Sequence, residues 1–71
     1  NPFRNKTTIS FNNPNNEVYT LCIFDLNGRK VSEIYDVRSN RIKFERGSLP
    51  EGVYFVELKG EKVYRGKMVV I

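Results

Sequence analysis

The chain has 71 residues, a formal net charge of +4, and 39% hydrophobic and 13% aromatic residues. This composition is too rich in aromatic residues for a disordered chain, and the single cysteine, Cys22, excludes an internal disulfide. No run approaches the roughly 18 apolar residues of a membrane-spanning helix, so we expect one small domain over residues 1–71 that folds by packing alone.

The first half of the chain predicts two strands with a loop between them. Residues 7–11 (TTISF) are β-branched and alternating, which is typical of a short strand. Residues 12–16 (NNPNN) favour turns, because Asn side chains bond to nearby backbone and Pro fixes φ. Residues 18–25 (VYTLCIFD) are rich in strand formers and apolar on both faces. This second strand is therefore expected in the middle of a sheet.

A hairpin is predicted directly after this strand. The dipeptide Asn27-Gly28 is a strong hairpin signal, because a type I′ turn needs positive φ at both of its central residues. It should fold the chain back into a strand over residues 30–37. With these two residues as the loop, Asp25 should face Lys30 and form an ion pair at the start of the hairpin.

The second half predicts three further strands, which are residues 40–45 (NRIKFE), 52–59 (GVYFVELK) and 62–71 (KVYRGKMVVI). Alternation turns Ile42 and Phe44 inward in the first of these, and places Tyr64, Met68 and Val70 on one face of the last. Loops rich in Gly and Pro separate the strands. The pattern predicts an all-β fold of six or seven short strands, arranged as an antiparallel sandwich or a small barrel.

The residue types argue against an enzyme. The chain has no histidine, so Cys22 has no imidazole to deprotonate it, and the commonest metal ligand is absent. Cys22 lies within an apolar strand, where a buried hydrophobic role is the simpler interpretation. The carboxylates are spread over different strands and turns, and their spacing pairs no two of them for acid–base chemistry. We therefore expect no catalytic activity, no metal and no cofactor.

Basic residues are frequent in the second half of the chain, at Arg38, Arg41, Lys43, Arg46, Lys59, Lys62, Arg65 and Lys67. Aromatic residues lie between them, as in a small β-barrel that stacks single-stranded bases. Alternation places several of these charges on solvated strand faces, and acidic residues interrupt any continuous stripe. We therefore expect no nucleic-acid binding, and interpret the charges as a device that keeps edge strands from pairing with other chains.

Five segments, in order and at their separations, resemble the C-terminal sorting domain of the bacterial type IX secretion system, the type A sorting-signal family of the Por secretion system. They are residues 1–3 (NPF), 7–11 (TTISF), 23–31 (IFDLNGRKV), 49–56 (LPEGVYFV) and 64–70 (YRGKMVV). The resemblance covers essentially the whole chain. It implies an immunoglobulin-like antiparallel β-sandwich, excised from the end of a larger secreted protein.

The resemblance also implies a function and a set of partners. Such a domain directs its cargo, the N-terminal part of the same protein, from the periplasm across the outer membrane to the cell surface or the medium. The implied partners are the type IX translocon, its outer-membrane shuttle barrel, and a sortase-like cysteine protease that removes the domain. The alternative is a non-catalytic interaction or carbohydrate-binding module of an extracellular protein, which would use exposed tyrosines.

Carried over position by position, the family's signal residues become Gly52, Tyr54, Gly66, Lys67, Met68, Val69, Val70 and Ile71. Structural roles explain three of them equally well, because Gly52 can end a turn, Tyr54 can pack in the core, and Gly66 can allow a bulge or a close approach. Core packing does not explain Lys67, a lysine within an otherwise apolar run. We therefore expect a recognition role for Lys67, and the alternative is a charge that keeps an edge strand from pairing with other chains.

Overall fold

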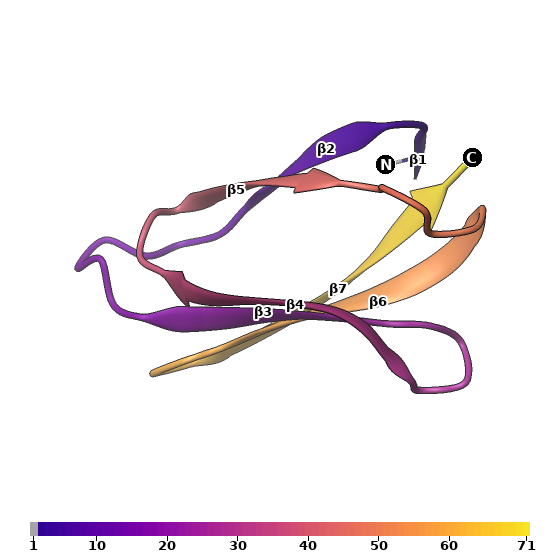
Figure 1. The fold of residues 1–71 in the computed structure, drawn as a ribbon. Coiled ribbons are helices and arrows are strands. Elements are labelled where there is room, and N and C mark those ends of the chain that lie inside the picture. Colours follow the sequence, from indigo (N-terminus) through magenta and orange to yellow (C-terminus); the bar gives the residue numbers. More distant parts are fainter. Residues whose placement is uncertain (1) are drawn as a thin grey trace.

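The computed structural model describes residues 2–71, which form seven strands arranged in two layers (Figure 1). The strands are β1 (Pro2–Phe3), β2 (Lys6–Ser10), β3 (Tyr19–Phe24), β4 (Lys30–Val37), β5 (Arg41–Glu45), β6 (Gly52–Lys59) and β7 (Val63–Val70). One sheet has the order β1-β7-β6-β3-β4, and the other consists of β2 and β5. The predicted all-β, immunoglobulin-like sandwich is confirmed.

Strand β1 joins the two ends of the chain. It pairs in parallel with the last residues of β7, Pro2 opposite Val69 and Phe3 opposite Val70, whereas the other strand pairs are antiparallel. The chain then leaves the five-stranded sheet and enters β2 in the opposite layer, so residues 2–10 supply one strand to each sheet. As a result, the beginning of the chain lies beside its end (Figure 1).

Strand β3 lies inside the five-stranded sheet, as its apolar sequence predicts. It pairs with β6 on one side and β4 on the other. Leu21 and Ile23 are completely buried, because they face the second layer. Cys22 points to the opposite face of this sheet but is still only 5% exposed, since neighbouring side chains cover it. The interpretation of Cys22 as a buried, small hydrophobic residue is confirmed.

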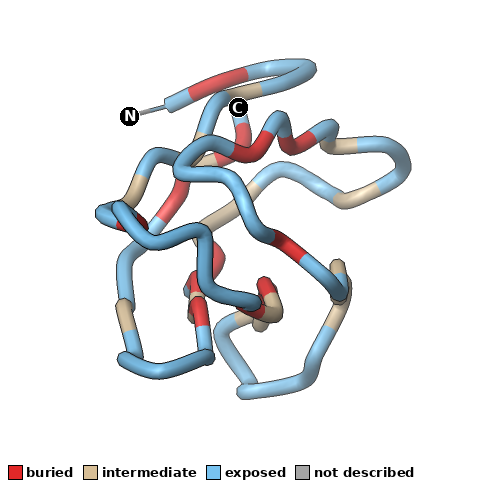
Figure 2. The backbone as a smooth tube through the Cα atoms, turned by 90° about the vertical axis from the view of Figure 1, so that its left-hand side faces the viewer, coloured by how far each residue is buried: buried red, intermediate tan, exposed pale blue. Residues whose placement is uncertain are grey.

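The core lies between the two layers and draws on six of the seven strands of residues 2–71. Its buried members are Phe3, Tyr19, Leu21, Ile23, Val37, Ile42, Phe44, Tyr54, Val56, Leu58, Met68 and Val70. Ile42 and Phe44 face inward on β5, as predicted, and Phe3 packs edge to face on Phe44 with ring centroids 6.4 Å apart. Buried segments therefore occur in both layers, while most residues of the loops between them are exposed (Figure 2).

The hairpin between β3 and β4 is confirmed, but its turn type and its register are wrong in the sequence prediction. Gly28 has a φ of 82°, whereas Asn27 does not have positive φ, so the turn is not type I′. The Asp25 carboxylate accepts hydrogen bonds from the backbone N–H groups of Asn27 and Arg29, both at 2.9 Å. This cap stabilises a three-residue loop, in which Asp25 forms its ion pair with Arg29 at 3.1 Å instead of with Lys30.

A single buried side chain organises the Asn-rich loop before β3. Asn13 is 5% exposed, and its amide group donates to the backbone carbonyls of Glu17 at 2.9 Å and Arg38 at 3.1 Å. Its side-chain oxygen accepts a hydrogen bond from the N–H of Glu17, also at 2.9 Å. The sequence predicts this loop, but its five consecutive turn-forming residues do not show which one is buried.

Candidate functional site

Two of the predicted site residues, Gly52 and Tyr54, have structural roles at the start of β6. Tyr54 is 5% exposed, and its hydroxyl group donates a hydrogen bond of 2.6 Å to the carbonyl oxygen of Pro50. Gly52 has a φ of 150°, a conformation that residues with a side chain rarely adopt. In the register of the sheet Gly52 lies opposite Val70 and Tyr54 opposite Met68, so the two adjacent strands bring these four residues together.

We expect Tyr54→Phe to lower the free energy of unfolding by about 1 kcal/mol. The substitution keeps the buried ring but removes the donor to Pro50, and a typical hydrogen bond contributes about 0.5–1.5 kcal/mol. Urea unfolding of the purified chain measures the effect. Tyr35→Phe is the matched control, because Tyr35 is 66% exposed and its loss should change stability by less than about 0.5 kcal/mol. Equal effects of the two substitutions would contradict the role of Tyr54.

The apolar residues at the end of the chain alternate between the core and the surface. Met68 and Val70 are 5% and 1% exposed and belong to the core, whereas Val69 is half-buried on the other face and Ile71 is 44% exposed. The N–H of Ile71 donates a 2.9 Å hydrogen bond to the carbonyl of Phe3. Only part of this predicted signal is therefore available to a partner while the domain stays folded.

Arg46 forms hydrogen bonds to four residues at this end of the molecule, although nothing in the sequence pattern distinguishes it. Its guanidinium group donates to the carbonyl oxygens of Leu49 at 2.8 Å, Ile71 at 3.1 Å and Arg4 at 3.2 Å. Its own N–H donates to the carbonyl of Asn5 at 2.8 Å. The loop between β5 and β6 is thereby fixed to both ends of the chain. Sequence reasoning missed this role, because Arg46 looks like one of several basic loop residues.

The other two predicted residues, Gly66 and Lys67, lie in the middle of β7. Lys67 is exposed on the outer face of the sheet, opposite Phe55, and forms no ion pair within residues 2–71. Gly66 lies opposite Val56 in a register that runs without a shift along the whole of β7, so there is no bulge. A Cβ atom added at Gly66 would have no heavy atom within 4 Å, so there is no close approach either.

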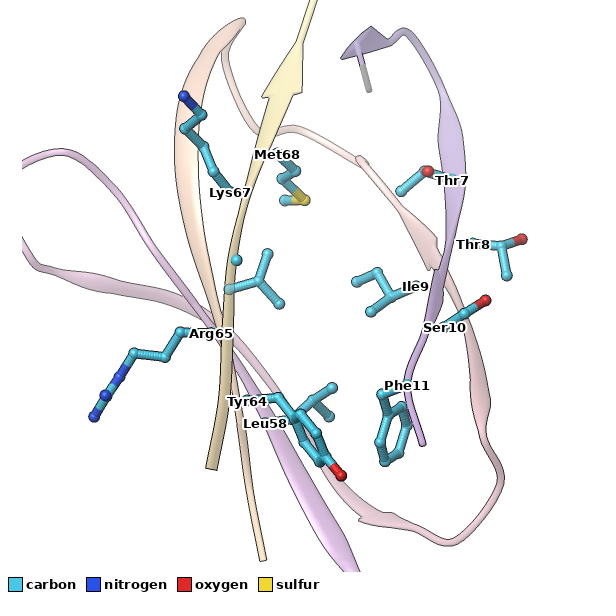
Figure 3. Close-up of a pocket in the computed structure, with 12 residues that line it drawn as sticks. Thr7, Thr8, Ile9, Ser10, Phe11, Leu58, Tyr64, Arg65, Lys67 and Met68 are labelled. Atoms are coloured by element: carbon cyan, nitrogen blue, oxygen red, sulfur yellow. The ribbon is translucent and has the colours of Figure 1, made fainter. Parts of the chain in front are cut away.

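A groove of about 360 Å³ lies between β2 and the part of β7 that β1 does not cover (Figure 3). Its lining includes Ile9 and Phe11 from the β2 side and Tyr64, Gly66 and Met68 from the β7 side. In Figure 3 the side chains of Ile9 and Met68 point into the groove, whereas those of Arg65 and Lys67 point away from it. Sequence reasoning missed the groove, because it depends on how the two sheets are placed.

Aromatic rings close one end of this groove. The ring centroid of Phe11 lies 5.8 Å from that of Tyr64 and 5.1 Å from that of Tyr19. The Tyr64 hydroxyl group also donates a 2.9 Å hydrogen bond to the carbonyl of Asn12. This contact joins β7 to the loop that follows β2. These contacts therefore fix one end of the groove.

Cys22 carries the only thiol of the chain, and titratable side chains lie beside it. Burial raises the pKa of its thiol, and a contact of 3.5 Å to the Glu33 carboxylate raises it further. Hydrogen bonds from the Tyr35 hydroxyl group and the Lys30 ammonium group lower the pKa of Glu33. The thiol is thus held in its protonated, poorly nucleophilic form.

No group of three or more His, Cys, Asp and Glu side chains within residues 2–71 is placed to hold a metal ion. The same residues contain no helix that is long and apolar enough to cross a bilayer.

Comparison with known proteins gives one match. The model of the family described as secretion system C-terminal sorting domain matches residues 1–71, the full length of the chain. No curated protein and no solved structure matches significantly. The match spans the same segments that carry the sequence resemblance, from the NPF at residues 1–3 to the YRGKMVV at residues 64–70. The chain belongs to the family of type IX secretion system C-terminal sorting domains.

Proposed function

We propose that this chain is the sorting signal of a cargo protein that precedes it, and that it takes the cargo through the type IX translocon. The observation that carries the proposal is the family match over all 71 residues. Membership of this family implies contact with the type IX machinery and export to the cell surface or the extracellular space. In our proposal the outer-membrane shuttle barrel then receives the domain, and a sortase-like protease removes it from the cargo.

The structure limits which residues can contact this machinery. Tyr54, Met68 and Val70 are buried, so in the folded domain they support the terminal strand without being exposed to a partner. Gly66 and Lys67 are consecutive residues of β7 and both are exposed, on opposite faces of the strand. Lys67 is the clearer recognition residue, because its ammonium group has no acidic partner within residues 2–71 and does not contribute to the core.

The alternative of a carbohydrate-binding module has less support. That interpretation needs exposed tyrosines, but Tyr19 and Tyr54 are buried and Tyr64 is half-buried. Tyr35 is 66% exposed, and its hydroxyl group is already bonded to the Glu33 carboxylate at 2.5 Å.

A reporter fusion tests the proposal. The chain is attached to the C-terminus of an inert periplasmic protein, which is produced in bacteria with and without the type IX translocon. We expect the reporter at the cell surface or in the medium only when the translocon is present, and without the domain attached. Periplasmic retention in both strains would reject the sorting function and favour an adhesive β-sandwich. Export with the domain still attached would reject proteolytic removal and leave the sorting function standing.

We expect Lys67→Glu to reduce export of this fusion about tenfold, which corresponds to about 1.4 kcal/mol of lost binding free energy. The substitution reverses an exposed charge without disturbing the core. Lys43→Glu is the matched control, because Lys43 is also exposed but lies on β5 in the other layer. Both variants should unfold at similar temperatures. Equal export of the two variants would contradict a specific role for Lys67.

A further inference from the structure

We propose that the groove between β2 and β7 receives one extended strand of a partner protein, with an apolar side chain over Gly66 and acidic side chains beside Lys67. We call the part of the groove bounded by Ile9, Val56, Tyr64, Gly66 and Met68 the Gly66 socket. This inference rests on the proposed function in so far as the partner belongs to the export machinery. The strand-binding property itself follows from the groove.

The Gly66 socket exists because one side chain is missing. On the inner face of β7, Tyr64 and Met68 carry large side chains, and the position between them has none. The backbone does not require glycine there, since the register is regular and an added Cβ would contact nothing within 4 Å. Glycine in a strand weakens it by roughly 0.5–1 kcal/mol relative to alanine. What Gly66 provides is therefore the space above Val56.

The backbone beside the socket is open to strand addition. On the side of β7 that faces β2, β1 covers Val69 and Val70, and no other strand within residues 2–71 pairs with residues 63–67 on that side. Within the same described residues, β2 pairs with β5 alone. Edge strands present unpaired N–H and C=O groups, and an extended peptide binds them by continuing the sheet. A strand laid along residues 63–67 would extend the five-stranded sheet on the side where β2 borders the groove.

The side chains around the groove define the chemistry of that strand. Successive residues of a strand point to opposite faces, so a strand added to β7 has one face toward the socket and one toward solvent. The socket face meets Ile9, Val56 and Met68, which require apolar residues. The solvent face meets Arg65 and Lys67. Arg65 is already paired with Glu57 at 3.2 Å, which leaves Lys67 as the cation for an acidic partner residue.

Amide hydrogen exchange tests this binding directly. The probes are seven-residue peptides in which Glu or Asp alternates with Ala, Val, Leu or Phe, each mixed at about 1 mM with the purified chain. We expect the acidic peptides with Val or Leu to slow exchange at residues 63–67. Matched peptides with Lys in place of the acids should give no protection. Absence of protection by every acidic peptide, or equal protection by the basic ones, would overturn the proposal.

A pair of variants shows whether the Gly66 socket is the site. Gly66→Val fills it with a side chain that favours strands and has open space around its Cβ, so the melting temperature should equal or exceed that of the parent chain. Protection by the peptides should then be lost. Ser10 also borders the groove, but its exposed side chain points away from it, so Ser10→Val adds similar bulk outside the Gly66 socket and should bind as the parent does (Figure 3). Binding by Gly66→Val at parental strength would overturn the proposal.

The reporter fusion separates this inference from the proposed function. If the parent is exported but Gly66→Val is not, while Ser10→Val is, both stand. If Gly66→Val is exported as well as the parent, the sorting function stands and the socket is overturned as a recognition site. If the parent is not exported but binds acidic peptides through the socket, the sorting function fails and the strand-binding groove remains.

Discussion

A chain that ends at Lys67 is expected to be unfolded at 25 °C. This truncation removes Met68 and Val70, which are 5% and 1% exposed in the core. It also removes the residues that pair with β1. Phe3 then loses the strand that holds its ring against Phe44. The last four residues therefore close one end of the sandwich, and do not form a tail attached to a finished domain.

The expected size of the effect follows from the small size of the domain. At about 0.05–0.15 kcal/mol per residue, a chain of 71 residues has a total stability of about 4–11 kcal/mol. Burial of a Val or Met side chain contributes about 1.5–3 kcal/mol, so the two lost side chains alone account for about 3–6 kcal/mol. The truncation also removes the hydrogen bond from the Arg46 guanidinium group to the Ile71 carbonyl and the one from the Ile71 N–H to the Phe3 carbonyl.

Circular dichroism and thermal unfolding measure this outcome, with Ile71→Ser as the control. Ile71 is 44% exposed, and the substitution keeps its backbone hydrogen bonds, so it should cost less than about 1 kcal/mol. A truncated chain that retains its β spectrum and unfolds cooperatively would contradict the expectation. Loss of export after removal of residues 68–71 would consequently report unfolding, which is why Lys67→Glu and Gly66→Val are the informative tests of recognition.

Most of the strands could be predicted because their signals are local. The alternation of Ile42 and Phe44 on β5, and of Met68 and Val70 on β7, sets the buried face of each strand without any knowledge of its neighbours. The hairpin at Gly28 was predicted for the same reason. Its register was not, because the Asp25 carboxylate caps the turn and lengthens the loop to three residues.

The remaining features depend on contacts between distant residues. Strand β1 has only two residues, and its partner is the end of β7. The guanidinium group of Arg46 bonds to Arg4 and Ile71, which are 42 and 25 positions away. The Gly66 socket needs β2 and β7 to lie on facing edges of different sheets. For the candidate site, the choice of Gly66 and Lys67 through resemblance stays a prediction, whereas the open space beside Gly66 is visible only in the structure.

Substitution of the same residue type at two glycines should give effects of opposite sign. A Cβ atom at Gly60 would lie 2.6 Å from the carbonyl oxygen of Val18 and 2.8 Å from the ring of Tyr19. Tyr19 is buried and cannot turn away, and a carbonyl oxygen moves only with its backbone. We expect Gly60→Ala to destabilise the domain by about 1–3 kcal/mol, the usual cost of overpacking.

Gly66→Ala, in contrast, should stabilise the domain by about 0.5–1 kcal/mol, because the backbone is extended and the added methyl group meets open space. Urea unfolding of the two variants beside the parent chain measures both effects. A loss of stability in Gly66→Ala as large as that in Gly60→Ala would show that β7 needs glycine for its backbone. The opposite signs would show that glycine at position 66 costs stability, as expected if the proposed Gly66 socket is kept open for a partner.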